Sequence, residues 1–140
     1  MDIRANLINQ FLRDEGLRLK PYKDSVGKLT IGIGRNLDDV GISHDEALLF
    51  LNNDIDRTEA RLRTELPWYL NLDDARKGVL VNMAFNMGVD KLLAFHNTLA
   101  FVQSGQYDKA ADAMLDSLWA KQVGIRAKRL AEQMRSGQWR

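Results

Sequence analysis

The 140-residue sequence contains no cysteine, and this absence excludes disulfide bonds and thiolate metal sites. Only two prolines are present, and no apolar run approaches the roughly 18 residues of a membrane-spanning helix. Neither sign of charge dominates, because the chain contains 20 Lys and Arg residues and 19 Asp and Glu residues. No internal repeat, low-complexity tract or flexible linker interrupts the chain. With 45% hydrophobic and 28% charged residues, the composition predicts one globular domain over residues 1–140.

The C-terminal end is basic although the whole chain is nearly balanced. Between residues 118 and 140 the only acidic residue is Glu132, and six residues are basic: Lys121, Arg126, Lys128, Arg129, Arg135 and Arg140. This bias favours an anionic partner, such as nucleic acid, a membrane surface or an anionic cell-wall polymer. An ordinary solvated helix face is the simpler interpretation of the same charges.

The N-terminal part of the chain is expected to hold one helix and one short β segment. Asp2 is a candidate N-cap, and Gly16 can supply the left-handed residue that ends the first helix. Glu15 is then fixed at the helix end and projects beyond it. Residues 24–27 have the pattern of a hairpin turn, and residues 29–34 (LTIGIG) have the pattern of a strand. Alternate glycines in a strand usually mark the close approach of another backbone or a ligand.

From residue 43 onward the pattern is helical. Ser43 and Glu46 have the spacing of a capping box, which predicts a long helix ending before Pro67. Apolar spacing and punctuation residues predict four further helices: one from Asn71 or Asp73 to Gly88, one capped by Asn97 and closed by Gly105, and two over 108–115 and 125–134. The predicted fold class is therefore α+β and mostly α.

Glu15, Asp24 and Thr30 fall within one unbroken stretch, EGLRLKPYKDSVGKLTIGIG. Glycoside hydrolysis needs an acid for the leaving oxygen and a carboxylate on the opposite face of the sugar, and these residues could converge on one ring. A glutamate at a helix end is more often simply solvated, and an aspartate in a turn more often forms the turn. No other candidate metal ligands accompany His44 or His96, and both are expected to be structural. Neither a metal nor a cofactor is therefore expected.

This stretch closely resembles the active-site segment of phage lysozymes of the T-even type, which are family-24 glycoside hydrolases. Further segments match in the family's order between about residues 6 and 139: NMAFNMG, AFHNTL, DSLW, RAKR and RSGQW. The resemblance implies a lysozyme-like fold with a small, shortened N-terminal β-hairpin lobe at about residues 13–42. Residues 1–12 and 43–140 would form a helical lobe that includes a C-terminal bundle.

The resemblance implies a muramidase that lyses bacteria. It would hydrolyse the β-1,4 bond between N-acetylmuramic acid and N-acetylglucosamine in peptidoglycan. By position, Glu15 would be the general acid, Asp24 the second carboxylate, and Thr30 the hydroxyl beside the attacking water. Arg126 matches an arginine that pairs with the catalytic glutamate. Inversion at the anomeric carbon is implied, and it requires carboxylates about 6.5–9.5 Å apart.

The same resemblance suggests sugar contacts and shows where this chain departs from its family. Phe85 and Thr98 match cleft positions, and Asn36 replaces an apolar cleft residue. Arg35 stands where the family has a histidine that serves stability through a partner carboxylate. Residues 35–42 are much shorter than their counterpart, which predicts a trimmed small lobe and altered sugar contacts.

Peptidoglycan is the expected partner of a monomeric protein that binds no nucleic acid and does not insert stably into membranes. Residues 1–16 lack the basic-then-apolar order of a secretory signal, so we expect synthesis in a host bacterial cytoplasm. Access to the wall would then depend on a holin-type pore. Two alternatives stay open: a lytic transglycosylase that leaves anhydro products, and a non-catalytic helical module that binds wall or nucleic acid.

Overall fold

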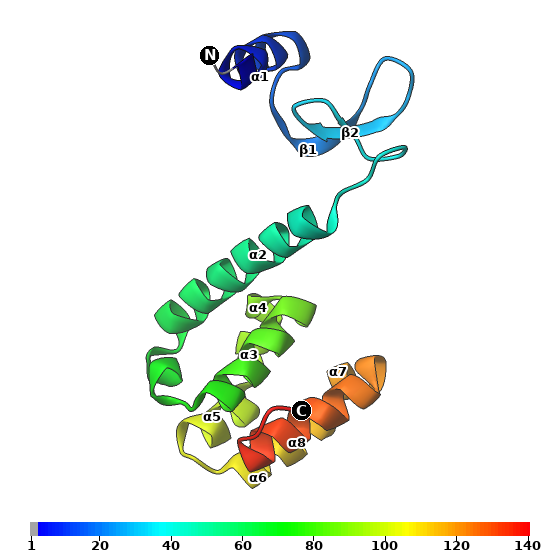
Figure 1. Cartoon of the computed structure of the whole chain (residues 1–140). Coiled ribbons are helices and arrows are strands. Elements are labelled where there is room, and N and C mark those ends of the chain that lie inside the picture. The colour runs from blue at the N-terminus through cyan, green and yellow to red at the C-terminus, as the bar shows by residue number, and fades with distance from the viewer. Residues whose placement is uncertain (1–2) are drawn as a thin grey trace. The chain divides into compact units, whose positions relative to one another are not determined.

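The computed structural model describes residues 3–140, and the chain divides into two compact units, Met1–Phe50 and Leu51–Arg140. Asp2, the candidate N-cap, lies outside the described residues. Over residues 3–140 the chain forms eight α-helices, one 3₁₀ helix and three strands (Figure 1), which confirms a mostly helical α+β fold. The expectation of a single domain stays a prediction.

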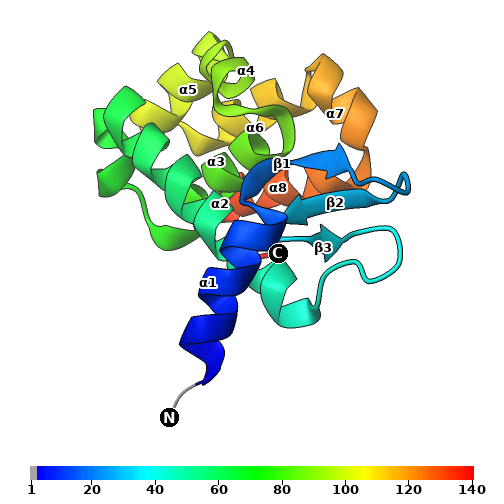
Figure 2. The same cartoon turned by 90° about the horizontal axis from the view of Figure 1, so that it is seen from above.

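The first unit contains one helix and one antiparallel sheet. Their bounds are α1 (Ile3–Glu15), β1 (Arg18–Lys23), β2 (Leu29–Gly32) and β3 (Arg35–Asn36). Figure 2 shows the three strands side by side, with β2 in the middle. Gly16 ends α1 as predicted, because its φ is 74° and its N–H donates to the Leu12 carbonyl at 3.1 Å. The chain therefore leaves the helix directly after Glu15.

The predicted strand over residues 29–34 is too long at its C-terminal end. β2 ends at Gly32, and residues 33 and 34 turn the chain into β3. Gly32 and Gly34 both have positive φ, 72° and 75°, which regular strand residues do not adopt. The two glycines therefore bend the chain, and the alternation that resembles a strand is the signature of a turn.

β1 is a strand that the sequence pattern does not predict, because Pro21 lies inside it. Proline cannot donate to a sheet ladder and is confined to outer strands and bulges. Both conditions are met here, since β1 is an outer strand and its pairing with β2 is irregular between Arg18 and Tyr22. The proline thus excludes a helix without excluding a strand.

The second unit is a helical bundle with an apolar core. Its elements are the end of α2 (His44–Glu65), η1 (Pro67–Asn71), α3 (Asp74–Met87), α4 (Val89–Leu93), α5 (His96–Gln103), α6 (Tyr107–Leu115), α7 (Leu118–Val123) and α8 (Ile125–Ser136). α8 packs against α3, α6 and α7, and α5 packs against α6. Leu80, Met83 and Met134 lie fully buried in this core. Between residues 3 and 140, no helix has the length and apolar character needed to cross a membrane.

Most predicted helix ends are confirmed by their caps. The Glu46 N–H donates to Ser43 Oγ at 3.1 Å, and the Ser43 N–H donates to Glu46 Oε1 at 2.8 Å, so the capping box forms. Asp73 caps α3 by accepting the Arg76 N–H at 3.2 Å. The long helix α2 stops before Pro67, as expected.

The predicted Asn97 cap is wrong. α5 already begins at His96, and Phe95 occupies the N-cap position without a side-chain hydrogen bond. The short helices α4 and α7 are also absent from the sequence prediction, since five or six residues are too few to establish a period.

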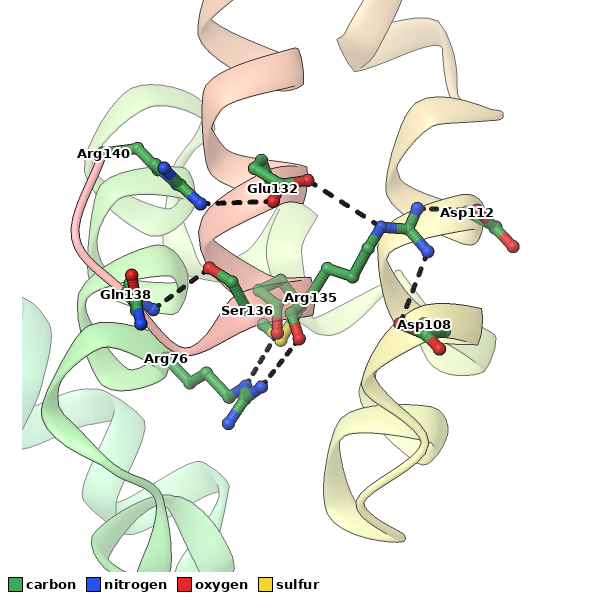
Figure 3. Close-up of polar contacts among 9 residues, drawn as sticks. Arg76, Asp108, Asp112, Glu132, Arg135, Ser136, Gln138 and Arg140 are labelled. Carbon is green, nitrogen blue, oxygen red and sulfur yellow. Dashed lines mark hydrogen bonds and ion pairs between the residues drawn. The ribbon is translucent and has the colours of Figure 1, made fainter.

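Arg76 of α3 holds the C-terminal end of α8. Its Nε donates to the Met134 carbonyl at 2.7 Å and its Nη2 to the Arg135 carbonyl at 2.9 Å (Figure 3). The guanidinium also lies over the Tyr107 ring, 3.6 Å from the centroid. The last carbonyls of a helix lack intrahelical donors and carry partial negative charge, so a partly buried cation there stabilises the bundle.

We expect Arg76→Ala to lower the free energy of unfolding by about 2–3 kcal/mol, because two helix-end carbonyls and the Tyr107 ring lose their partner. Urea denaturation measures this loss. Arg57→Ala is the matched control, since Arg57 is exposed and pairs with Asp54 on the same helix turn, and it should change stability by less than about 0.5 kcal/mol. Equal losses in the two variants would contradict the role of Arg76.

The basic C-terminal end is partly neutralised within its own unit. Arg135 pairs with Asp108 at 3.5 Å and with Asp112 at 2.9 Å, and Arg140 pairs with Glu132 at 3.3 Å (Figure 3). All five side chains are about one third exposed or more, so each pair contributes little to stability. These pairs lower the positive charge that this end can offer to an anionic partner.

Candidate active site

Glu15 is the last residue of α1, and its carboxyl group lies against the turn between β2 and β3. A Cβ atom built on Gly34 would lie 3.0 Å from Glu15 Oε2 and 3.1 Å from both Cδ and Cγ. The alternate glycines predicted the close approach of another backbone or a ligand, but at Gly34 the group that comes close is the Glu15 side chain. The helix end and the turn together place the acid beside the sheet.

Asp24 opens the hairpin between β1 and β2. Its Oδ1 accepts the N–H groups of Val26 at 2.9 Å and Lys28 at 2.8 Å, and its carbonyl accepts the Gly27 N–H at 3.0 Å. The predicted hairpin turn is therefore confirmed. Among the described residues 3–140, none donates a hydrogen bond to Oδ2, so one carboxylate oxygen shapes the turn and the other is available to a ligand.

Thr30 lies in the middle of the sheet and pairs with Tyr22 on one side and Asn36 on the other. Thr30 is only 3% exposed, and its Oγ1 donates to the Lys28 carbonyl at 2.9 Å. These contacts give Thr30 a structural role in the hairpin. Its place beside an attacking water stays a prediction.

The three candidate residues are arranged along β2. Asp24 lies at the level of Lys28 at one end, Thr30 lies within the strand, and Glu15 lies beside the turn at the other end. From Lys28 to Gly32 the backbone spans about 13 Å. This separation favours two carboxyl groups with space between them over a pair in direct contact. Among residues 3–140, no group of three or more His, Cys, Asp or Glu is placed to hold a metal ion.

Arg35 and Glu46 form an ion pair that the sequence did not reveal. Arg35 Nη1 and Nη2 donate to the two Glu46 oxygens at 2.7 and 2.6 Å, and Nη1 also donates to the Gly41 carbonyl at 3.2 Å. The hydrogen bond from Arg35, followed by that from the Ser43 N–H, lowers the pKa of Glu46 to about 2. One carboxylate therefore joins β3, the short segment of residues 35–42 and the start of α2.

The lowered pKa of Glu46 predicts that the folding stability of the protein depends on pH. Because the pKa falls from 4.5 to about 2, this contribution is complete above about pH 4.5 and is lost as pH falls through about 2. Glu46→Gln keeps a capping-box acceptor but removes the charge, so we expect a lower urea midpoint at pH 7. The difference from wild type should shrink between pH 5 and pH 2, as urea titrations at each pH would show.

Asp45→Asn is the control for this measurement, because Asp45 is fully exposed and lies 3.9 Å from His44, its neighbour in the chain. Its urea midpoint should follow the wild type at every pH. A Glu46→Gln deficit that stays constant from pH 5 to pH 2 would argue against the ion pair as its source.

Asn36, expected to contact a sugar, has its amide engaged in the fold. Its Oδ1 accepts the Asp39 N–H at 2.9 Å, and its Nδ2 donates to Asp39 Oδ2 at 3.0 Å. The residue also lines a hollow of about 590 Å³ in the first unit, together with Leu17, Gly34 and Phe50. Asn36 therefore shapes the short segment after β3, and its contact with a sugar stays a prediction.

In the second unit, Phe85 and Arg126 line one hollow of about 580 Å³. Phe85 is 47% exposed, and Arg126 donates from Nε and Nη2 to Asn82 Oδ1 at 2.9 and 2.7 Å. Thr98 is only 3% exposed, which favours packing over the sugar contact expected for it. The sugar contact of Phe85 and the pairing of Arg126 with Glu15 stay predictions. Sequence reasoning missed Asn82, which carries no cap or periodic signal.

Comparison with known proteins gives matches across both units. A family model described as "Phage lysozyme" matches residues 13–136, which include Glu15, Asp24 and Thr30. The chain is 29% identical over 154 residues to "Probable T4-type lysozyme 1" of Dictyostelium discoideum, with 89% of this chain and 90% of that protein covered. It is 31% identical over 130 residues to "Endolysin" of Salmonella phage P22, with 86% and 85% covered. It is also 31% identical over 146 residues to "Pre-baseplate central spike protein Gp5" of Enterobacteria phage T4, of which 25% is covered, against 84% of this chain.

Proposed function

Because the chain belongs to the phage lysozyme family and is a glycoside hydrolase of lysozyme type, we propose that its substrate is bacterial peptidoglycan. The bond cut is the β-1,4 link between N-acetylmuramic acid and N-acetylglucosamine. The observation that carries the proposal is the placement of Asp24, Thr30 and the end of α1 at Glu15 along β2. All three residues lie inside the matched region.

The proposed reaction uses the two carboxyl groups in different roles. Glu15 donates its proton to the glycosidic oxygen as the bond from C1 to that oxygen breaks, because an alkoxide is a poor leaving group. Asp24 offers the oxygen that the turn does not use, stabilises the positive charge that develops on the sugar, and accepts a proton from the attacking water. The new bond joins C1 to the water oxygen, and the departing sugar keeps the proton from Glu15 as a hydroxyl.

Inversion is the stereochemical outcome that we propose. A water molecule between the sugar and Asp24 needs carboxyl groups about 6.5–9.5 Å apart, whereas a direct attack by Asp24 needs about 5 Å. Asp24 and Glu15 lie near opposite ends of β2, which argues against direct contact between the two carboxyl groups. Thr30 is proposed to orient the water as an acceptor, because its own proton is donated to the Lys28 carbonyl.

We propose a lytic role for this enzyme, which the relative named endolysin supports. In that role a monomeric enzyme made in a host bacterial cytoplasm reaches the wall through a holin-type pore and lyses the cell. A module that only binds nucleic acid is less favoured, since Arg126, Arg135 and Arg140 are engaged by partners in their own unit.

The test is to add the purified protein to purified peptidoglycan and to identify the released fragments by mass. Reducing ends that have gained one water would support hydrolysis, and the anomer formed first, read by NMR, would decide between inversion and retention. Anhydro ends would establish the lytic transglycosylase instead. Wild-type protein that releases nothing would favour the non-catalytic module.

A further inference from the structure

Two glycines flank Ile33 in the turn between β2 and β3, and they differ in one respect. Gly32 and Gly34 have nearly the same positive φ, 72° and 75°. A Cβ atom at Gly32 would meet nothing within 4 Å. A Cβ atom at Gly34 would meet three consecutive atoms of Glu15, namely Oε2 at 3.0 Å and Cδ and Cγ at 3.1 Å.

Positive φ favours glycine at both positions, and position 34 carries an additional constraint. Asparagine and aspartate also adopt positive φ at modest cost, so the turn by itself would accept them. The contact with Glu15 is a separate demand, because carbon atoms pack best at about 3.5–4.0 Å and three distances near 3.0 Å are too short. An added methyl group would therefore require the end of the Glu15 side chain to move by a few tenths of an ångström.

We propose that Gly34 is a positioning residue for the reaction, whose bare backbone forms the surface against which Glu15 rests. This inference rests on the proposed function, in which Glu15 delivers the proton. Contact with Gly34 limits the positions open to the carboxyl group on the side of the sheet. The acid thus meets the glycosidic oxygen from a restricted range of directions, although Glu15 itself is exposed.

Gly34→Ala and Gly32→Ala form a matched pair, since both place an alanine at positive φ in the same turn. On soluble peptidoglycan strands, we expect Gly34→Ala to lower kcat by about tenfold or more, because misplacing a catalytic group by a fraction of an ångström to an ångström has effects of this order. KM should stay within about twofold, because contacts with the rest of the strand are unchanged. Gly32→Ala should keep kcat within about twofold.

A second readout tests the contact without using activity. Alanine at either position should lower the Tm by several degrees through backbone strain, and Gly34→Ala should lower it further through the collision with Glu15. In a Glu15→Ala background the collision is absent, so Gly34→Ala should then cost no more Tm than Gly32→Ala. This coupling is expected only if the two residues touch.

These results distinguish a failure of the proposed function from a failure of the positioning role of Gly34. An inactive wild type would overturn the proposed function. An active wild type, with equal kcat for Gly34→Ala and Gly32→Ala, would overturn the positioning role alone. A Tm cost of Gly34→Ala that is the same with and without Glu15 would also overturn it, whereas a kcat loss together with Tm coupling would support it.

Discussion

Glu15→Gln is expected to lower kcat on peptidoglycan by about 10³-fold or more, because a positioned general acid contributes up to about 10⁴-fold and the leaving sugar alkoxide needs a proton. The amide has nearly the same shape as the carboxyl group and can rest against Gly34 in the same way. It cannot supply the acidic proton. Initial rates of reducing-end formation at saturating substrate measure this loss.

Asp14→Asn is the matched control for Glu15→Gln. Asp14 is the neighbouring carboxylate on α1, is exposed and pairs with Arg13 at 2.9 Å. Its loss should leave kcat within about twofold of wild type, since a single exposed ion pair contributes little. Both variants should keep the wild-type Tm. If Glu15→Gln retained full activity, another group would have to be the acid and the proposed mechanism would fail.

Asp24→Asn is expected to lower kcat by about 10²- to 10³-fold, because the developing positive charge loses its anionic partner and the water loses its base. Asparagine keeps an oxygen that can accept the Val26 and Lys28 N–H groups, so the hairpin should persist. The change therefore isolates charge from shape. The same rate assay, with far-UV circular dichroism to verify the fold, measures it.

Asp38→Asn provides the comparison for Asp24→Asn, because Asp38 Oδ2 accepts the Leu29 N–H at 2.7 Å on the same hairpin. This change removes a carboxylate that accepts a backbone hydrogen bond but has no proposed part in the reaction. The kcat should therefore stay within about twofold of the wild-type value. A mild effect of Asp24→Asn with anhydro products would identify a lytic transglycosylase, for which one catalytic carboxylate suffices.

Helix ends were predictable from sequence wherever the signal is local. Gly16 ends α1 through its own φ, and the hydrogen bonds between Ser43 and Glu46 span three residues. The residues that determine these helix ends are therefore all visible in the local sequence. The Asn97 prediction failed because an asparagine inside a first turn looks the same in sequence as one at the cap. The Phe95 N–H bonds to the Leu92 carbonyl, so the chain is already turning before Asn97.

The candidate site was predictable only in part, because some of its contacts join residues that are not close in the sequence. The resemblance supplied Glu15, Asp24 and Thr30, and the hairpin turn at Asp24 was visible in the sequence. The contact between Glu15 and Gly34 and the ion pair between Arg35 and Glu46 join different elements. No periodicity or spacing rule reports such contacts, because they depend on how the chain turns between the partners.

Pro21 has a consequence beyond the shape of β1. An outer strand presents unpaired backbone groups that can recruit a strand from another copy and begin aggregation. Pro21 has no N–H to offer, the pairing of β1 is irregular between Arg18 and Tyr22, and Lys20 and Lys23 add like charges along the strand. These features oppose pairing of β1 with a strand from another copy, so the hairpin that holds Asp24 is protected from edge-to-edge aggregation.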